Sequence, residues 1–102
     1  MRFVMHISLP LEKFNQAVRD GSIGAKMAKI LADLKPEAAY FTATDGKRGG
    51  FLIVDLADAS EIPRFAEPWF LLFDAAVDFM PTMTPEDLAR GGLDELGKKW
   101  GK

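Results

Sequence analysis

Two segments of the chain combine strand-like alternation with apolar residues on both faces. Between Arg2 and Leu9, one face is predicted to carry Phe3, Met5 and Ile7, and the other Val4, His6 and Ser8. The segment from Phe51 to Leu56 gives the strongest strand signal in the sequence, and it is also apolar on both faces. This pattern is typical of strands that are buried from both sides.

Helical spacing of apolar residues follows the first strand. The stripe from Leu11 to Val18 predicts one helix, which Asp20-Gly21 interrupts. Ser22 is predicted to cap a second helix from Ile23 to Leu34. This helix must end near Pro36, because the residue before a proline disfavours helical geometry.

The middle of the chain predicts a β-hairpin and a third helix. Ala38 to Thr44 is prone to form a strand, and the glycine-rich connection Asp45 to Gly50 joins it to the strand that starts at Phe51. Ser60 is predicted to cap a helix that ends at Phe73 and is kinked or restarted at Pro68.

A final strand and an extra helix complete the pattern. Ala75 to Met83 predicts the strand, and Thr84 followed by Pro85 predicts a capped helix start. Gly91-Gly92 weakens the middle of this last helix. The order predicts one α+β domain over residues 1–102 with the ferredoxin-like βαββαβ arrangement. Right-handed crossovers place the helices on one side of a four-stranded antiparallel sheet, with the first and third strands in the middle.

This arrangement leaves the second face of the sheet uncovered. Several large apolar side chains are expected on that face, and leaving them in water is costly at about 25 cal/mol per Å². We therefore expect a homodimer in which two copies pack their open sheet faces together about a two-fold axis. The alternative is that the C-terminal helix folds across the open face of its own sheet.

Composition narrows the classes of partner. Thirteen basic and fifteen acidic side chains leave a net charge of -2, which gives no global attraction to nucleic acid or anionic lipid. No apolar stretch is long enough to span a bilayer. From the charge and from the lack of such a stretch, we expect neither a nucleic acid nor a membrane as a partner. The chain contains no cysteine, which is consistent with the cytoplasm.

Three motifs resemble those of a family of small bacterial proteins of unknown function. They are Phe51 to Leu56 after Gly-Lys-Arg-Gly-Gly, then Glu67-Pro68-Trp69-Phe70, then Met83-Thr84-Pro85-Glu86-Asp87-Leu88. That family is similar to the dimeric α+β barrel superfamily, which includes muconolactone isomerase, antibiotic-biosynthesis monooxygenases and YCII-related proteins. The resemblance spans roughly residues 2 to 90 and implies the fold and the dimer. It implies no particular reaction, because one fold hosts many chemistries.

His6 is the only histidine, and it lies on a predicted central strand. An imidazole can act as a general base near neutral pH, or it can be a core histidine that is hydrogen-bonded to a neighbour. Asp55 and Asp78, on the third and fourth strands, are its candidate partners. Strand adjacency permits a His–Asp pair, but the register of the strands cannot be read from the sequence.

A second set of candidates comprises Tyr40, Arg48, Glu67 and Trp69. Tyr40 can orient a bound carbonyl compound, and Arg48 offers a fork for a carboxylate. Glu67 can be a base or the ion-pair partner of Arg48, and Trp69 can line an aromatic pocket or belong to the core. The glycine-rich connection lacks a following helix to receive a phosphate, and no histidine and carboxylate cluster has metal spacing. No metal and no cofactor are therefore expected.

These observations leave two functions open. The first is a cofactor-independent isomerase or monooxygenase that acts on a small aromatic or carbonyl compound. Its site would lie in the cleft between sheet and helices, with His6 and Tyr40 as acid–base or orienting groups. The second is a non-catalytic homodimer that binds a small ligand or has a structural role. A roomy cavity at His6 would favour the enzyme.

Overall fold

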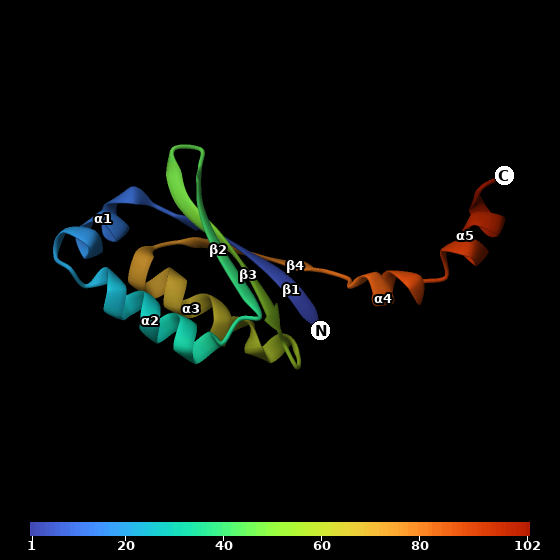
Figure 1. The fold of residues 1–102 in the computed structure, drawn as a ribbon, viewed down its shortest axis with the longest axis horizontal. Coiled ribbons are helices and arrows are strands. Elements are labelled where there is room, and N and C mark those ends of the chain that lie inside the picture. Colours follow the sequence, from blue (N-terminus) through green and yellow to red (C-terminus); the bar gives the residue numbers. More distant parts are fainter.

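Four antiparallel strands form a single sheet in the computed structural model, which describes all 102 residues (Figure 1). The elements are, in chain order, β1 (Arg2–Leu9), α1 (Leu11–Arg19), α2 (Ile23–Leu34), β2 (Ala38–Thr44), β3 (Lys47–Asp55), the 3-10 turn η1 (Ala59–Glu61), α3 (Ile62–Phe73), β4 (Ala76–Pro81), α4 (Pro85–Ala89) and α5 (Leu93–Trp100). The strand order in the sheet is β2-β3-β1-β4, which is the ferredoxin-like arrangement. The predicted fold class is thereby confirmed.

The helices α1, α2 and α3 cover one face of the sheet (Figure 1). Alternation places Met5, Ile7 and Leu9 of β1 on that face, and all three are buried. On β3, Leu52 and Val54 do the same. Trp69 and Phe73 of α3, both fully buried, fill the space between the layers.

The β2–β3 hairpin is tighter than the sequence predicts. Its turn consists of Asp45 and Gly46, both with positive φ (54° and 74°), as in the two-residue turns that match the twist of a hairpin. The remaining glycines of the predicted connection, Gly49 and Gly50, lie inside β3 and are buried. The strand therefore starts at Lys47 and not at Phe51.

Two of the three predicted hydroxyl caps are wrong. The Ser22 hydroxyl is buried without a hydrogen-bond partner, and the Ser22 backbone N–H donates to Asp20 Oδ1 at 2.8 Å. Before α3, Asp58 and not Ser60 is the capping residue, since its side chain accepts from the Ser60 N–H. The Thr84 cap is confirmed as a full capping box.

The C-terminal segment extends away from the rest of the chain (Figure 1). We call residues 1–82 the body and residues 83–102 the arm. Gly92, with φ 77°, separates α4 from α5, so the predicted last helix is two helices. The molecule measures 60 × 29 × 19 Å along its principal axes, and the arm does not cover the open sheet face. No helix is both long and apolar enough to cross a bilayer.

Candidate functional site

Four side chains, one from each strand, form a line across the uncovered face of the sheet. His6 of β1 stands opposite Phe51 of β3 and, on its other side, opposite Asp78 of β4. Tyr40 of β2 stands opposite Phe51. Residues directly opposite in antiparallel strands point to the same face, with Cβ atoms about 4.5–5.5 Å apart. We call Tyr40, Phe51, His6 and Asp78 the open-face row.

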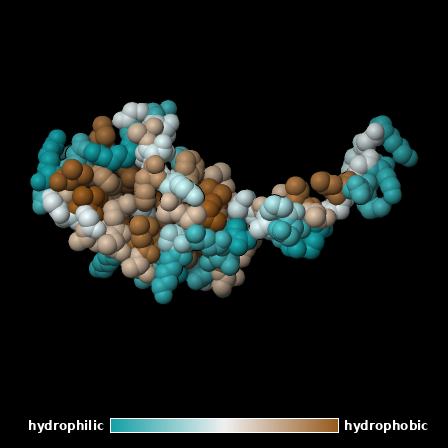
Figure 2. Space-filling view, viewed as in Figure 1, coloured by the Kyte–Doolittle hydropathy of each residue, from teal (hydrophilic) through white to brown (hydrophobic).

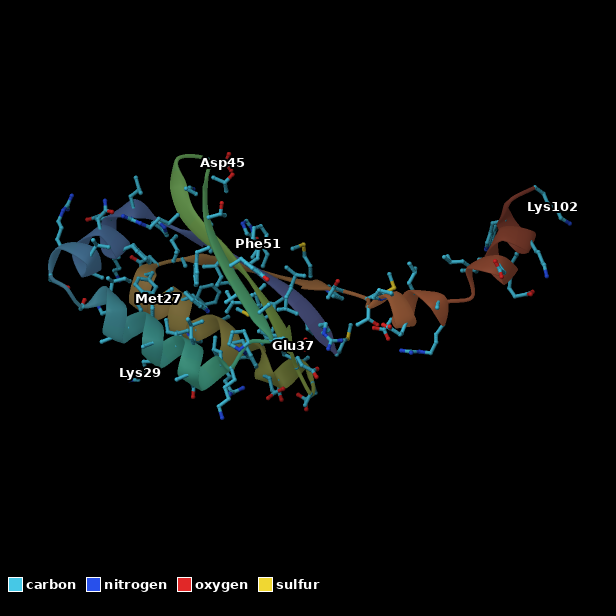
Figure 3. All side chains as sticks on the ribbon, in the orientation of Figure 1. Met27, Lys29, Glu37, Asp45, Phe51 and Lys102 are labelled. Atoms are coloured by element: carbon cyan, nitrogen blue, oxygen red, sulfur yellow. The ribbon has the colours of Figure 1, made fainter.

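The centre of the open-face row is an aromatic stack. The rings of His6 and Phe51 lie 4.9 Å apart between centroids, at an interplanar angle of 21°. Phe51 is 39% exposed and Tyr40 is 70% exposed, and Figure 3 shows Phe51 apart from helix α2, which carries Met27 and Lys29. No hydrogen bond joins His6 to Asp78, although the two residues are cross-strand neighbours. The row therefore presents an imidazole beside a carboxylate and two aromatic rings, groups that can bind and exchange a proton with a flat polar compound.

Two further bands of residues flank the row on the same face. One band is apolar and consists of Met80, Val4, Ile53 and Ala38. The other has short side chains and consists of Ala76, Ser8, Gly49 and Thr42. The open face thus combines an apolar band, a polar and aromatic row, and a band of small residues.

The expected site in the cleft between sheet and helices is not present. His6 and Tyr40 point away from the helices, because they alternate with the residues that face the core. The space between the layers is filled by thirteen clustered buried residues. Four surface cavities exist, and none of them is lined by His6, Tyr40 or Arg48.

Asp55 is not a neighbour of His6. It stands opposite Arg2, four residues along β1 from His6, and its Oδ1 accepts a hydrogen bond from the N-terminal amine of Met1 at 2.8 Å. This hydrogen bond, together with the charge of the amine, lowers the pKa of Asp55. Of the two predicted carboxylate partners of His6, the register selects Asp78.

Arg48 is held by helix α1 and does not face the open-face row. Its guanidinium donates to Asn15 Oδ1 at 2.6 Å and lies 4.6 Å from the centroid of the Phe14 ring. Glu67 is exposed on α3 and forms no ion pair with Arg48. Arg48 therefore ties the start of β3 to α1.

Trp69 lies in the core. Its side chain is 0% exposed and its ring centroid lies 6.3 Å from that of Phe73. Its indole N–H is buried and has no hydrogen-bond partner. No cavity lies beside the ring, so Trp69 is a core residue and does not line an aromatic pocket.

The two glycines in β3 are required by the sheet itself. A Cβ at Gly49 would lie 2.8 Å from the backbone oxygen of Ile7, and a Cβ at Gly50 would lie 2.9 Å from the Phe41 ring.

No helix follows the hairpin turn, so the glycine-rich segment has no N-terminal amides to hold a phosphate. Among His, Cys, Asp and Glu, no group of three or more is placed to hold a metal ion.

The sequence reasoning missed an apolar groove on the outer surface of the helices. The groove has a volume of about 760 Å³ and lies between α2 and α3. Leu71, which lines the groove, is 73% exposed. The sequence does carry a signal for this groove, because α3 contains the apolar run from Trp69 to Phe73. A helix that is apolar on most of its sides cannot bury all of these sides against one sheet.

A scan of the chain against models of known protein families finds no match, and a search among curated proteins finds no significantly similar relative. The fold is therefore the level at which the chain can be classified: it is a small α+β fold with a ferredoxin-like four-stranded antiparallel sheet.

Proposed function

We propose that this protein is a non-catalytic homodimer of the dimeric α+β barrel superfamily, formed by two copies that pack their open sheet faces together. The sheet order β2-β3-β1-β4 with helices on one face supports this assignment. The bacterial and cytoplasmic origin expected from the sequence stays a prediction.

The uncovered apolar band on the sheet carries the proposal. Val4 and Ile53 on the two central strands are only half-buried in the single chain, and Met80 on the edge strand is 45% exposed. Fully burying one such side chain is worth about 1.5–3 kcal/mol. Because the arm extends away from this face, the alternative cover considered from the sequence does not occur in the single chain.

A two-fold axis running along the strands gives the open-face row a complementary partner. Such an axis, placed between β1 and β3, reverses the row, so that Asp78 of one copy meets the Tyr40 hydroxyl of the other. It also brings the His6–Phe51 stacks of the two copies together. Aligned packing of two sheets is common, and buried aromatic residues are enriched at such interfaces.

Light scattering on the wild-type chain at micromolar concentration tests the dimer. We expect a mass near twice the 11.3 kDa of one chain. Ile53→Asp places a charge in the apolar band and should give a monomer that remains folded by circular dichroism. Leu11→Asp, at an exposed apolar position on α1, is the matched control and should remain dimeric. A monomeric wild type at this concentration would sink the proposal.

A second candidate function is a cofactor-independent isomerase or monooxygenase that acts on a small aromatic or carbonyl compound. The observation that favours it is the convergence of His6, Asp78 and Tyr40 on one row, with no hydrogen bond holding the imidazole. In a dimer, this row would line the space between the two sheets. NMR titration with small aromatic acids and ketones tests this function. Saturable shifts at these three residues, lost in His6→Ala, are expected for the enzyme, and a flat response to all compounds counts against it.

A further inference from the structure

One side of the arm is apolar and exposed. On α5, Leu93, Leu96 and Trp100 share this side at helical spacing, and Trp100 is 72% exposed. Before them, Met83 is 65% exposed and Leu88 of α4 is 46% exposed. Figure 2 shows hydrophobic residues exposed along the arm. The arm thus carries a long apolar surface in contact with water.

The two helices of the arm need a surface on which to pack. They have 5 and 8 residues, whereas isolated helices shorter than about 12–15 residues are marginal in water. Leu88 of α4 and Leu93 of α5 line one surface cavity of about 630 Å³. The apolar residues of the two helices are therefore continuous, and one partner surface can cover both.

The charged residues of the arm lie on its other sides. Helical spacing separates the four charged residues of α5 from its apolar stripe; they are Asp94, Glu95, Lys98 and Lys99. Lys98 pairs with Glu95 at 3.3 Å, and Arg90 pairs with Asp87. Residues 83–102 carry four acidic and four basic side chains, so the arm has no basic face that would hold anionic lipid. The apolar side is therefore the docking surface.

Both arms of the proposed dimer leave it at the same end. β4 ends at Pro81, opposite Phe3, so the arm leaves the sheet where β1 begins. The Thr82 N–H donates to the Arg2 carbonyl at 3.1 Å, which keeps the start of the arm beside β1. A two-fold axis along the strands preserves the direction of every strand, so the second arm starts at this end too.

The starts of the two arms are close enough for their helices to meet. An axis between β1 and β3 lies one and a half strand spacings from β4, which is about 7 Å. With the two sheets about 10 Å apart, the two β4 ends are about 17 Å from each other. Packed helices have axes 8–10 Å apart, so each arm has to lean toward the axis by only about 4 Å.

The body offers little apolar surface at this end. Of its exposed large apolar residues, only Met1 and Ile62 lie there, next to the end of β3 and at the start of α3. The others lie along the strands, on α1 and in the second half of α3. The one surface at this end whose apolar extent matches that of an arm is the arm of the second copy.

We propose that the two arms of the dimer pack against each other through their apolar sides, about the same two-fold axis as the sheets. The inference rests on the proposed homodimer. The same side of each arm makes the contact, so it closes at two copies and does not propagate. It places α4 nearest the axis and leaves the charged sides in water.

The size of the sheet face supports the need for this contact. Four strands spaced by about 4.8 Å and about 20 Å long span a face of only about 400 Å². A stable interface usually buries about 800 Å² of accessible surface on each partner. Paired arms enlarge the interface at the end of the sheet where the strands stop.

Cross-linking of a single-cysteine variant tests the arm contact. The chain has no cysteine, so Ala89→Cys links two copies through a short bismaleimide reagent only where the two Ala89 positions meet. Ala89 is on the apolar side of α4, four residues after Pro85. The matched control is Glu86→Cys, on a charged side of the same helix. We expect about tenfold more covalent dimer for Ala89→Cys than for the control.

Each other outcome contradicts the contact. Equal yields in the two variants, or no covalent dimer, with a wild type that is dimeric by light scattering overturn the arm contact alone. Loss of the cross-link when vesicles of anionic lipid are added would assign the apolar side to a membrane surface. A monomeric wild type overturns the homodimer itself, so the two failures are distinguishable.

A charge on the apolar side provides the second measurement. Leu88→Asp changes both arms at once and should raise the dissociation constant of the dimer by about tenfold or more, because burial of a leucine is lost. Leu11→Asp on α1 should leave this constant unchanged. The body makes no use of Leu88 in its core, so circular dichroism should show both variants folded. An unchanged dissociation constant in Leu88→Asp would overturn the contact.

Discussion

The body and the arm are built from similar helices, but they are held in different ways. Every buried residue of the molecule lies in the body, and none lies in the arm. The arm has local hydrogen bonds instead: Thr84 Oγ1 accepts from the Asp87 N–H, and an Asp87 carboxylate oxygen accepts from the Thr84 N–H, both at 3.1 Å. Burial of apolar area stabilises the body, whereas the arm has correct capping without a core. The difference predicts that the body keeps its fold without help from the arm.

The two tryptophans give the largest expected contrast between these regions. Trp69 in the body is 0% exposed and Trp100 in the arm is 72% exposed. Trp69→Ala should lower the free energy of unfolding by about 3–5 kcal/mol, because it leaves a large cavity between sheet and helices. Urea denaturation followed by circular dichroism measures the loss.

Trp100→Ala is the matched control for this measurement. At concentrations where the chain is monomeric, it should change the free energy of unfolding by less than about 0.5 kcal/mol. Equal losses in the two variants would mean that the arm is part of the core and would remove the distinction.

A second contrast lies inside the body, at two adjacent glycines on opposite faces of β3. A Cβ at Gly49 would meet the Ile7 backbone oxygen at 2.8 Å, and the sheet cannot move this atom without losing register. Gly49→Ala should therefore destabilise the body by about 1–3 kcal/mol. Thermal unfolding monitored by circular dichroism measures the effect.

Gly50→Ala should cost less than Gly49→Ala. The nearest atom to its Cβ, at 2.9 Å, belongs to the Phe41 ring, which is 48% exposed and can turn away. The Tyr40 backbone oxygen at 3.0 Å sets a smaller residual strain. The reverse order of the two variants would contradict the account of β3 as a strand that needs its glycines.

The sequence predicted the elements of the body because periodicity alone defines them. The strand Arg2–Leu9, the helix Ile23–Leu34 and the strand Ala38–Thr44 lie at their predicted bounds. The start of β3 was missed because Gly49 and Gly50 are typical of loops. They belong to a strand here only because neighbouring chain segments approach closely, which is a tertiary effect.

The candidate site could be predicted only in part. The alternation along β1 places His6 and Met5 on opposite faces of the sheet, but it does not say which face the helices cover. The choice between Asp55 and Asp78 as the neighbour of His6 depends on register, and register is set by pairing between distant segments. The angle between α4 and α5 depends on the φ of 77° at Gly92, and a pattern of apolar residues does not fix this angle.

The smallest expected effect concerns the pH dependence of the arm. The Asp87 carboxylate accepts from Thr84, first from its backbone N–H and second from its side chain, and this lowers the pKa of Asp87 below its ordinary value of about 3.9. A carboxylate with a lowered pKa in the folded state stabilises the structure above the unfolded pKa, and this contribution is lost as the pH falls through the folded pKa. Acid should therefore loosen the start of α4.

NMR titration of the Asp87 carboxylate and of the Thr84 amide, from neutral pH downward, measures this effect. We expect the midpoint below the ordinary Asp value, with hydrogen-exchange protection of α4 lost in the same pH range. In Asp87→Asn the Thr84 amide should no longer titrate, while the body retains its urea midpoint. A midpoint at or above the ordinary value would mean that the capping box does not persist in solution. The arm would then have neither burial nor a capping box to order it, and only the body would keep its structure.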